Sequence, residues 1–242
     1  MTYRAVLSTV LRVFLSVFMG VVVMLTGCSV GGNKKAEDEK RYQAVLAHQP
    51  VGYWPADEGE GDVLTDRSGK GNNGKIYNIP WAKGLLDFTS RYQWIEIPVL
   101  PEYQGRSFTL GGWICTRITY INNGMTFIGS AKGITNNTEL TNVAFALRIG
   151  AKNTVDAVSS GKADALGSRT RGIAIEPLKW QHVMYTFENG NASLYINGSL
   201  VQSAAGVAFE SLKFPLMIGY ESGWWDVNGG SKSLDGTVRD IV

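Results

Sequence analysis

The side chains that could act as nucleophiles or metal ligands are few in this chain of 242 residues. Its two histidines, His48 and His182, lie far apart, and its two cysteines are Cys28 and Cys115. A zinc site needs closely spaced His or Cys ligands, so neither pair predicts one. His182 lies in the alternating run Gln181–Tyr185, with no partner at the spacing of a catalytic triad, and we expect a hydrogen-bonded structural histidine.

Carboxylates are more numerous, and the densest run outside the N-terminal segment extends from Asp57 to Asp62 (DEGEGD). Hydrolysis of a glycosidic bond uses two carboxylates held on opposite sides of that bond. A strand presents acids on one face only when they alternate with other residues. The run from Asp57 to Asp62 is interrupted by glycine and predicts a loop. We therefore expect a protein that is not an enzyme, and a glycoside hydrolase with another arrangement of carboxylates is the less favoured alternative.

The N-terminal segment predicts export. Arg4 and Arg12 precede an apolar run of 12 residues, Val13–Met24, and Leu25-Thr26-Gly27-Cys28 follows. This is the order of a secretory signal peptide, and the run is short of the roughly 20 residues of a spanning helix. The last four residues resemble the lipobox of bacterial lipoproteins, which implies acylation of Cys28 and cleavage before it. The other interpretation is an ordinary signal peptide in which Cys28 is incidental.

The lipoprotein resemblance also bears on location and charge. Ser29 is not the aspartate that retains such proteins at the inner membrane, so we expect an outer-membrane protein of the bacterial cell envelope, with the face undetermined. Removal of residues 1–27 takes away two of the 23 basic residues and none of the 21 acidic ones, which leaves 21 minus 21, or zero. A neutral chain does not favour a nucleic-acid partner.

Behind the signal peptide we expect a flexible tether over residues 28–40, because this stretch is polar and has no apolar period. Arg41–Ala47 could add one or two helical turns. Residues 41–242 then predict one all-β domain, since short β-branched and aromatic runs alternate with Gly, Asn, Asp and Ser clusters. The expected strands are 52–55, 75–77, 85–88, 94–97, 108–117, 126–130, 143–149, 154–158, 172–175, 181–187, 192–196, 200–202, 215–220 and 237–241.

Three kinds of connection are predicted. Asn197-Gly198 supplies the two positive φ angles of a type I′ turn, so Ala192–Gln202 is expected to be a tight hairpin. Gly69–Gly74 fits a turn with positive φ angles or close backbone approach. Ala131–Asn142 and Ser159–Arg171 are expected to be long loops.

Four segments, in order, resemble the LamG-like jelly-roll domains of the concanavalin A-like lectin and glucanase superfamily. The resemblance implies an antiparallel jelly-roll β-sandwich over residues 41–242. The segments are Pro50–Trp54 with Glu58-Gly59 and Asp66–Gly74, then Phe108–Ile114, then Trp180–Val183 with Leu194–Gly198, and finally Leu234–Ile241.

The resemblance implies roles for several positions. Trp113 and Trp180 would fill the space between two sheets. Structural calcium, the one cofactor expected, would bind Asp57, Asp66 and Asp240, with Asp235 as a substitute. The other interpretation is that these acids cap turns. The E-x-D-x-x-E strand of the laminarinase-like enzymes is absent.

A non-catalytic binding site is the remaining hypothesis. Trp224, Trp225, Asp226 and Asn228 lie in a Gly-rich segment, and two adjacent tryptophans of an extended segment cannot both point into a core. Exposed aromatic rings stack on sugars, so a glycan is the expected ligand, with Tyr220 as a weaker addition. An envelope or extracellular protein is the alternative partner. One tryptophan could instead close the sandwich while the other covers a loop.

Overall fold

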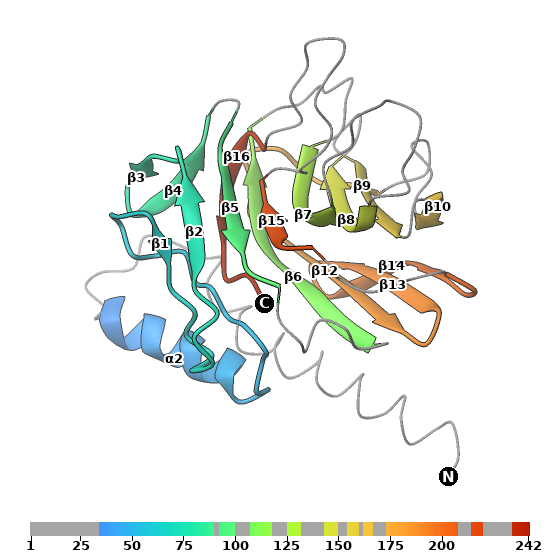
Figure 1. Ribbon diagram of the computed structural model, residues 1–242, viewed down its shortest axis with the longest axis horizontal. Coiled ribbons are helices and arrows are strands. Elements are labelled where there is room, and N and C mark those ends of the chain that lie inside the picture. The colour runs from blue at the N-terminus through green and yellow to red at the C-terminus, as the bar shows by residue number, and fades with distance from the viewer. Residues whose placement is uncertain are drawn as a thin grey trace.

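The structure is a computed structural model, and its elements are shown in Figure 1. It describes residues 34–89, 92–99, 107–117, 125–131, 143–149, 154–159, 162–166, 173–207, 214–219 and 234–242.

In the described part of the chain, helix α2 precedes the strands and comprises the 13 residues Lys34–Leu46. Its Ala, Glu, Lys, Gln and Leu residues favour helix. Side-chain pairs one turn apart add to this: Gln43 donates to Glu39 at 2.8 Å, and Arg41 lies 3.2 Å from Asp38. The second half of the expected tether is therefore helical. A polar composition is shared by flexible tethers and surface helices, so it could not separate the two.

The strands form two antiparallel sheets. One sheet is nine-stranded, in the order β1-β2-β5-β15-β7-β8-β9-β10, with β11 also paired to β9, and the other is seven-stranded, in the order β14-β13-β12-β6-β16-β4-β3. We call them sheet B and sheet D. The strands are β1 (Val63–Leu64), β2 (Gly74–Tyr77), β3 (Trp81–Ala82), β4 (Leu85–Phe88), β5 (Trp94–Ile97), β6 (Ser107–Thr116), β7 (Met125–Ala131), β8 (Val143–Ile149), β9 (Thr154–Ser159), β10 (Lys162–Leu166), β11 (Ile173–Ala174), β12 (Gln181–Glu188), β13 (Asn191–Ile196), β14 (Ser199–Ala204), β15 (Leu216–Ile218) and β16 (Gly236–Arg239).

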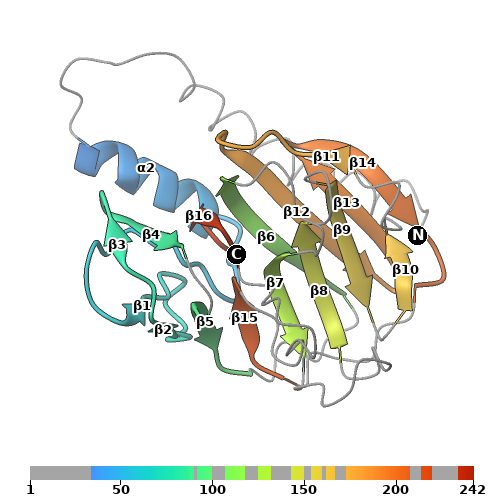
Figure 2. The ribbon, with the colours of Figure 1, turned by 90° about the horizontal axis from the view of Figure 1, so that it is seen from above.

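The two sheets lie face to face (Figure 2), which confirms the predicted antiparallel β-sandwich. Most of the expected strands are present within one or two residues of the predicted bounds. The expected strand 52–55 is wrong, because only Trp54 pairs there, in an isolated bridge with Ile241. The expected loop Ser159–Arg171 is wrong in part, because Lys162–Leu166 forms β10 against β9. Its sequence, KADAL, has little β propensity, and pairing with a neighbouring strand decides its conformation.

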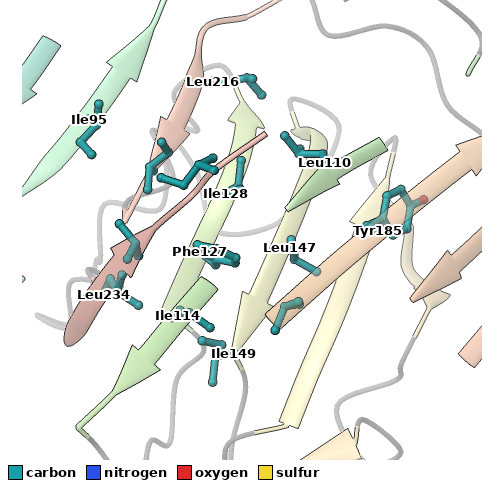
Figure 3. Packing of buried hydrophobic residues seen from close by; sticks show 14 of the residues in the cluster. Ile95, Leu110, Ile114, Phe127, Ile128, Leu147, Ile149, Tyr185, Leu216 and Leu234 are labelled. Carbon is teal, nitrogen blue, oxygen red and sulfur yellow. The ribbon is translucent and has the colours of Figure 1, made fainter. Parts of the chain in front are cut away.

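The core lies between the sheets. Ile114 and Tyr185 of sheet D and Phe127, Leu147 and Ile149 of sheet B are each at most 1% exposed. Figure 3 shows these side chains pointing into the space between the strands. Alternation along each strand sends every second residue into this layer, which is why period-two patterns located the strands.

Two predicted turns are confirmed. Asn197 and Gly198 have φ angles of 50° and 76°, as a type I′ turn requires, and they join β13 to β14. Gly69 and Gly71 have φ angles of 83° and 79°, and Gly74 lies so close to Ile95 that a Cβ would be 3.0 Å from it.

Two tryptophans lie elsewhere than predicted. Trp113 pairs with His182 across β6 and β12, while its neighbours Leu110 and Ile114 are buried in the core. Trp113 is therefore on the outer face of sheet D, and it and Trp180 are half-buried outside the core cluster. The prediction that both rings fill the sandwich is wrong. The register of β6 places Trp113 outside, and Trp180, which precedes β12, lies against Arg239.

Candidate functional site

The predicted ligand segment begins and ends at one point of the fold. Tyr220, Trp224, Trp225, Asp226 and Asn228 lie outside the described residues. The residues on either side of the segment are described: the N–H of Leu234 donates to the carbonyl of Gly219 at 2.8 Å, and the N–H of Gly219 donates to the carbonyl of Phe127 at 3.0 Å. The segment thus leaves from the end of β15 in sheet B and returns beside it into sheet D.

Gly219 makes this exit possible. Its φ angle is 81°, in the region that favours glycine. A Cβ built at Gly219 would overlap the ring of Phe88, which is fully buried. Only glycine satisfies both conditions, so the starting direction of the predicted ligand segment is determined by the fold.

Arg117 joins three elements at the same end of the sandwich. Its Nε donates to Asp235 at 2.8 Å, its Nη1 to Asp87 of β4, and its Nη2 to the carbonyl of Phe88. Burial acts to lower the pKa of Arg117, but the hydrogen bonds and charges of Asp87 and Asp235 raise it above its ordinary value. We call Arg117, Asp87 and Asp235 the stem clamp, because Asp235 directly follows Leu234.

The first acid of the predicted calcium set, Asp66, organises the Gly-rich turn. Its carboxylate accepts the backbone N–H groups of Tyr53, Ser68 and Asn72 at 3.0, 2.8 and 2.9 Å and the Ser68 hydroxyl at 2.8 Å. Burial acts to raise the pKa of Asp66, and these donors together hold it below its ordinary value. Asp66 therefore acts as the acceptor of a turn, as its alternative interpretation proposed.

Asp57 is bound by helix α2. Arg41 Nη2 lies 2.9 Å from Asp57 Oδ2, and the Tyr42 hydroxyl donates to the same oxygen. The guanidinium of Arg67 lies 4.7 Å from the Tyr42 ring centroid. Burial and the hydrogen bond to Asp57 raise the pKa of Tyr42 to about 12.

Asp240, which follows β16, belongs to the same network. The Tyr53 hydroxyl donates to Asp240 at 2.7 Å, and Arg41 Nε lies 3.4 Å from Asp240. Burial raises the pKa of Asp240, although Arg41, Tyr53 and Arg239 act to lower it. We call Arg41, Tyr42, Tyr53, Asp57 and Asp240 the α2 clasp.

These contacts test how well the acids fit calcium. Asp57 and Asp240 share the cation of Arg41, Asp66 accepts backbone N–H groups, and Asp235 lies in the stem clamp at the other end of β16. Across the described ranges, no three His, Cys, Asp or Glu side chains are grouped to hold a metal ion. The carboxylates of Asp57 and Asp240 already bind the guanidinium of Arg41, which calcium would have to displace.

Aromatic side chains and Arg239 gather on the outer face of sheet D. The Arg239 guanidinium lies 4.6 Å from the Trp180 ring centroid and 5.7 Å from that of Trp113. The His182 ring lies 5.1 Å from Trp113, and burial lowers the pKa of His182 to about 4. His182 is thus a neutral packing residue near pH 7, which agrees with the predicted structural role.

A buried ion pair on sheet B was not found from the sequence. Arg148 and Asp156 face each other across β8 and β9, with Nε–Oδ1 and Nη2–Oδ2 distances of 2.9 and 3.2 Å. They are 7% and 3% exposed. The sequence pattern that could have indicated this pair was weak, because single arginines and aspartates are common in alternating strands. The arginines of the stem clamp and the α2 clasp escaped notice for the same reason.

The predicted lipidation site, Cys28, lies outside the described residues, as do Ser29 and the signal peptide. In the described part of the chain, none of the helical sequence has the length and apolar character of a membrane span.

The sandwich and its sequence define the class of protein. A family model described as the concanavalin A-like lectin/glucanases superfamily matches residues 89–242. This is more than half of the chain, and the chain therefore belongs to that superfamily. A comparison of the sequence with curated proteins gives no match.

Solved structures share the fold at low identity. Trypanosoma rangeli sialidase in complex with 2,3-difluorosialic acid superposes with a TM-score of 0.58 at 15% identity, over 98% of this chain and 36% of the sialidase chain. This chain thus spans about a third of the length of that enzyme. Domain 4 of AbnA, a GH43 extracellular arabinanase from Geobacillus stearothermophilus, in complex with arabinotriose, superposes with a TM-score of 0.50 at 13% identity, over 79% of this chain and 89% of the domain. The fold is therefore found in glycosidases as well as in a domain bound to a sugar.

Proposed function

We propose that this protein is a lipid-anchored module of the bacterial cell envelope that binds carbohydrate and does not catalyse a reaction. The observation that carries the proposal is the set of contacts that flank residues 220–233: Gly219 and Leu234 are hydrogen-bonded at 2.8 Å, and Arg117 binds Asp235 at 2.8 Å. A loop with a rigid stem presents its side chains at lower entropic cost on binding. This loop contains Trp224 and Trp225.

Two further points support a sugar as the ligand. The superfamily includes lectins, and the arabinanase domain of similar fold is bound to arabinotriose. The absence of the E-x-D-x-x-E strand supports binding without hydrolysis. The acids that the structure describes near the loop stem, Asp87 and Asp235, are both bound to Arg117 and are not free to act as acid and base.

A glycan array tests the binding. Residues 29–242, which keep helix α2 whole, should bind a subset of glycans. Trp224→Ala and Trp225→Ala should lose about tenfold or more in affinity, since stacking contacts of this kind dominate small sites. Leu200→Ala, at a residue 56% exposed on β14, is the surface control and should bind as the parent does.

The outcomes separate the alternatives. A parent protein that melts cooperatively and binds no glycan would exclude the lectin function and favour an envelope protein as partner. Release of reducing ends from a bound glycan would show that the protein is an enzyme. Cys28→Ser should shift the protein from the outer-membrane fraction to the soluble fraction of cells, and retention in the membrane would contradict the anchor.

A further inference from the structure

Helix α2 is fastened to the domain at one end of the last strand. Asp240 follows β16 and contacts Arg41 at 3.4 Å, and Asp57 of the opening segment contacts the same guanidinium at 2.9 Å. Asp38 lies 3.2 Å from Arg41 within the helix. Arg41 is 20% exposed, and Asp240 only 7%. Burial acts to lower the pKa of Arg41, and the charges of these acids raise it, so the guanidinium stays charged.

The loop stem is fastened at the other end of the same strand. Asp235 precedes β16 and binds Arg117, while Gly236 pairs with Thr116 and Arg239 with Trp113. A strand rises about 3.3 Å per residue, so the five steps from Asp235 to Asp240 separate the two arginine sites by roughly 17 Å. Figures 1 and 2 show α2 beside the C-terminal end of the chain, where β16 finishes.

The chain between the predicted lipid and the helix is short. Cys28 and Lys34 are six residues apart, and a fully extended chain spans at most about 3.6 Å per residue, or about 20 Å in total. Because the α2 clasp holds the helix on the domain, this distance limits how far the domain can lie from the bilayer. If helix α2 were not docked on the domain, its own length would add to the greatest distance between the domain and the bilayer.

We propose that the face of the domain that carries α2 lies against the lipid bilayer, and that the stem clamp, at the opposite end of β16, lies away from the membrane. The proposal rests on the lipid anchor of the proposed function. The α2 clasp is the device that sets this orientation, since it turns a flexible connection into a docked one. The bilayer is the partner because the predicted acyl chains of Cys28 would lie in it and only six residues separate Cys28 from Lys34 of the docked helix.

Fluorescence quenching on vesicles tests the orientation. The acylated protein, produced in cells with Cys115→Ser, is labelled at Lys35→Cys on α2 or at Thr89→Cys, which follows β4 at the loop-stem end; both positions are exposed. Phosphatidylethanolamine–phosphatidylglycerol vesicles carry a nitroxide quencher on the lipid headgroup. We expect the label at position 35 to be quenched at least threefold more strongly than that at position 89. Equal quenching or the reverse order would overturn the proposal.

Two variants identify the cause. Arg41→Ala should bring the two quenching values close together, whereas Lys40→Ala, an exposed neighbour on the helix, should leave the ratio unchanged. A Gly-Ser linker of about 20 residues between Asn33 and Lys34 should also equalise the labels without altering the clasp, which covers the case in which Arg41→Ala does not fold. A ratio that neither variant changes would overturn the role of the clasp. If the Cys28→Ser variant bound to vesicles as strongly as the parent does, this result would instead contradict the lipid anchor.

Discussion

The hydroxyl of Tyr53 donates a hydrogen bond of 2.7 Å to the carboxylate of Asp240, 187 residues further along the chain. Both side chains are buried. The backbone adds two bonds beside this one, between Trp54 and Ile241, at 2.8 and 2.9 Å. The opening segment and the last strand therefore close the sandwich together, and the side-chain bond lies at the centre of the α2 clasp.

Removal of the Tyr53 hydroxyl should destabilise the protein. Tyr53→Phe leaves a buried carboxylate with one donor fewer, and we expect a loss of about 1–3 kcal/mol in the free energy of unfolding. Urea titration monitored by tryptophan fluorescence measures it. Tyr185→Phe is the matched control. The Tyr185 hydroxyl is buried and has no hydrogen-bond partner among the described residues, so its removal should be neutral or stabilising. Equal losses in the two variants would show that the bond to Asp240 contributes nothing.

Substitution of Gly219 should be more costly than substitution of another glycine with positive φ. Gly219→Ala combines a φ angle of 81° with overlap on Phe88, for an expected loss of about 2–4 kcal/mol. Gly84→Ala has a φ angle of 76° but open space around the new Cβ, and should lose about 1 kcal/mol. Thermal melting compares them. If both variants melted at the same temperature, the close packing on Phe88 would be refuted.

Calcium should not stabilise the parent protein. A ligand that binds only the folded state raises the melting temperature, but Arg41 already neutralises Asp57 and Asp240. We expect the same melting temperature in calcium and in chelator. In Arg41→Ala, which leaves both carboxylates without that cation, calcium should raise the melting temperature more than in the parent. A clear rise in the parent would instead support the predicted calcium site.

The stability should depend on pH through His182. Its pKa in the folded protein is lowered to about 4, so between pH 6.5 and 4 the unfolded chain binds a proton that the folded protein does not. Stability is therefore present above this window and is lost as the pH falls through it. Each pKa unit corresponds to about 1.4 kcal/mol. Between pH 7 and 4, the free energy of unfolding of the parent should therefore fall by at least about 1.4 kcal/mol more than that of His182→Gln.

Urea unfolding at the two pH values provides the comparison, with His48→Gln at an exposed site as control. The control should follow the parent. A His182→Gln variant with the parent's full loss of stability would show that other groups cause the pH dependence.

Disruption of the stem clamp should weaken sugar binding. Arg117→Ala frees Asp235 and Asp87, so the loop must be ordered on binding, and we expect an affinity about tenfold lower, or about 1.4 kcal/mol. Isothermal titration with a glycan identified on the array measures it. Arg67→Ala, which loses an ion pair and a ring contact at the other end of the sandwich, should bind normally. Equal affinities for Arg117→Ala and the parent would show that the stem clamp does not contribute to sugar binding.

Local patterns were sufficient to predict the strands and several turns. Period-two alternation and β-branched residues placed β4, β5 and β8 at their observed bounds, and Asn197-Gly198 predicted its turn. These features depend on neighbours in sequence, because alternation sets the buried face and positive φ angles select Asn and Gly. The family resemblance rested on the same local segments and is confirmed by the match over residues 89–242.

Tertiary structure alone decided on which face of the sheet Trp113 lies and which charged side chains meet. Trp113 lies outside the sandwich because β6 pairs with β12 and β16 in one register, and a shift of one residue would reverse its side. Arg41 meets Asp57 and Asp240 only after the first and last segments of the domain come together. Long side chains of opposite charge carry no sequence period that marks their partners, so contacts between distant segments had to come from the fold.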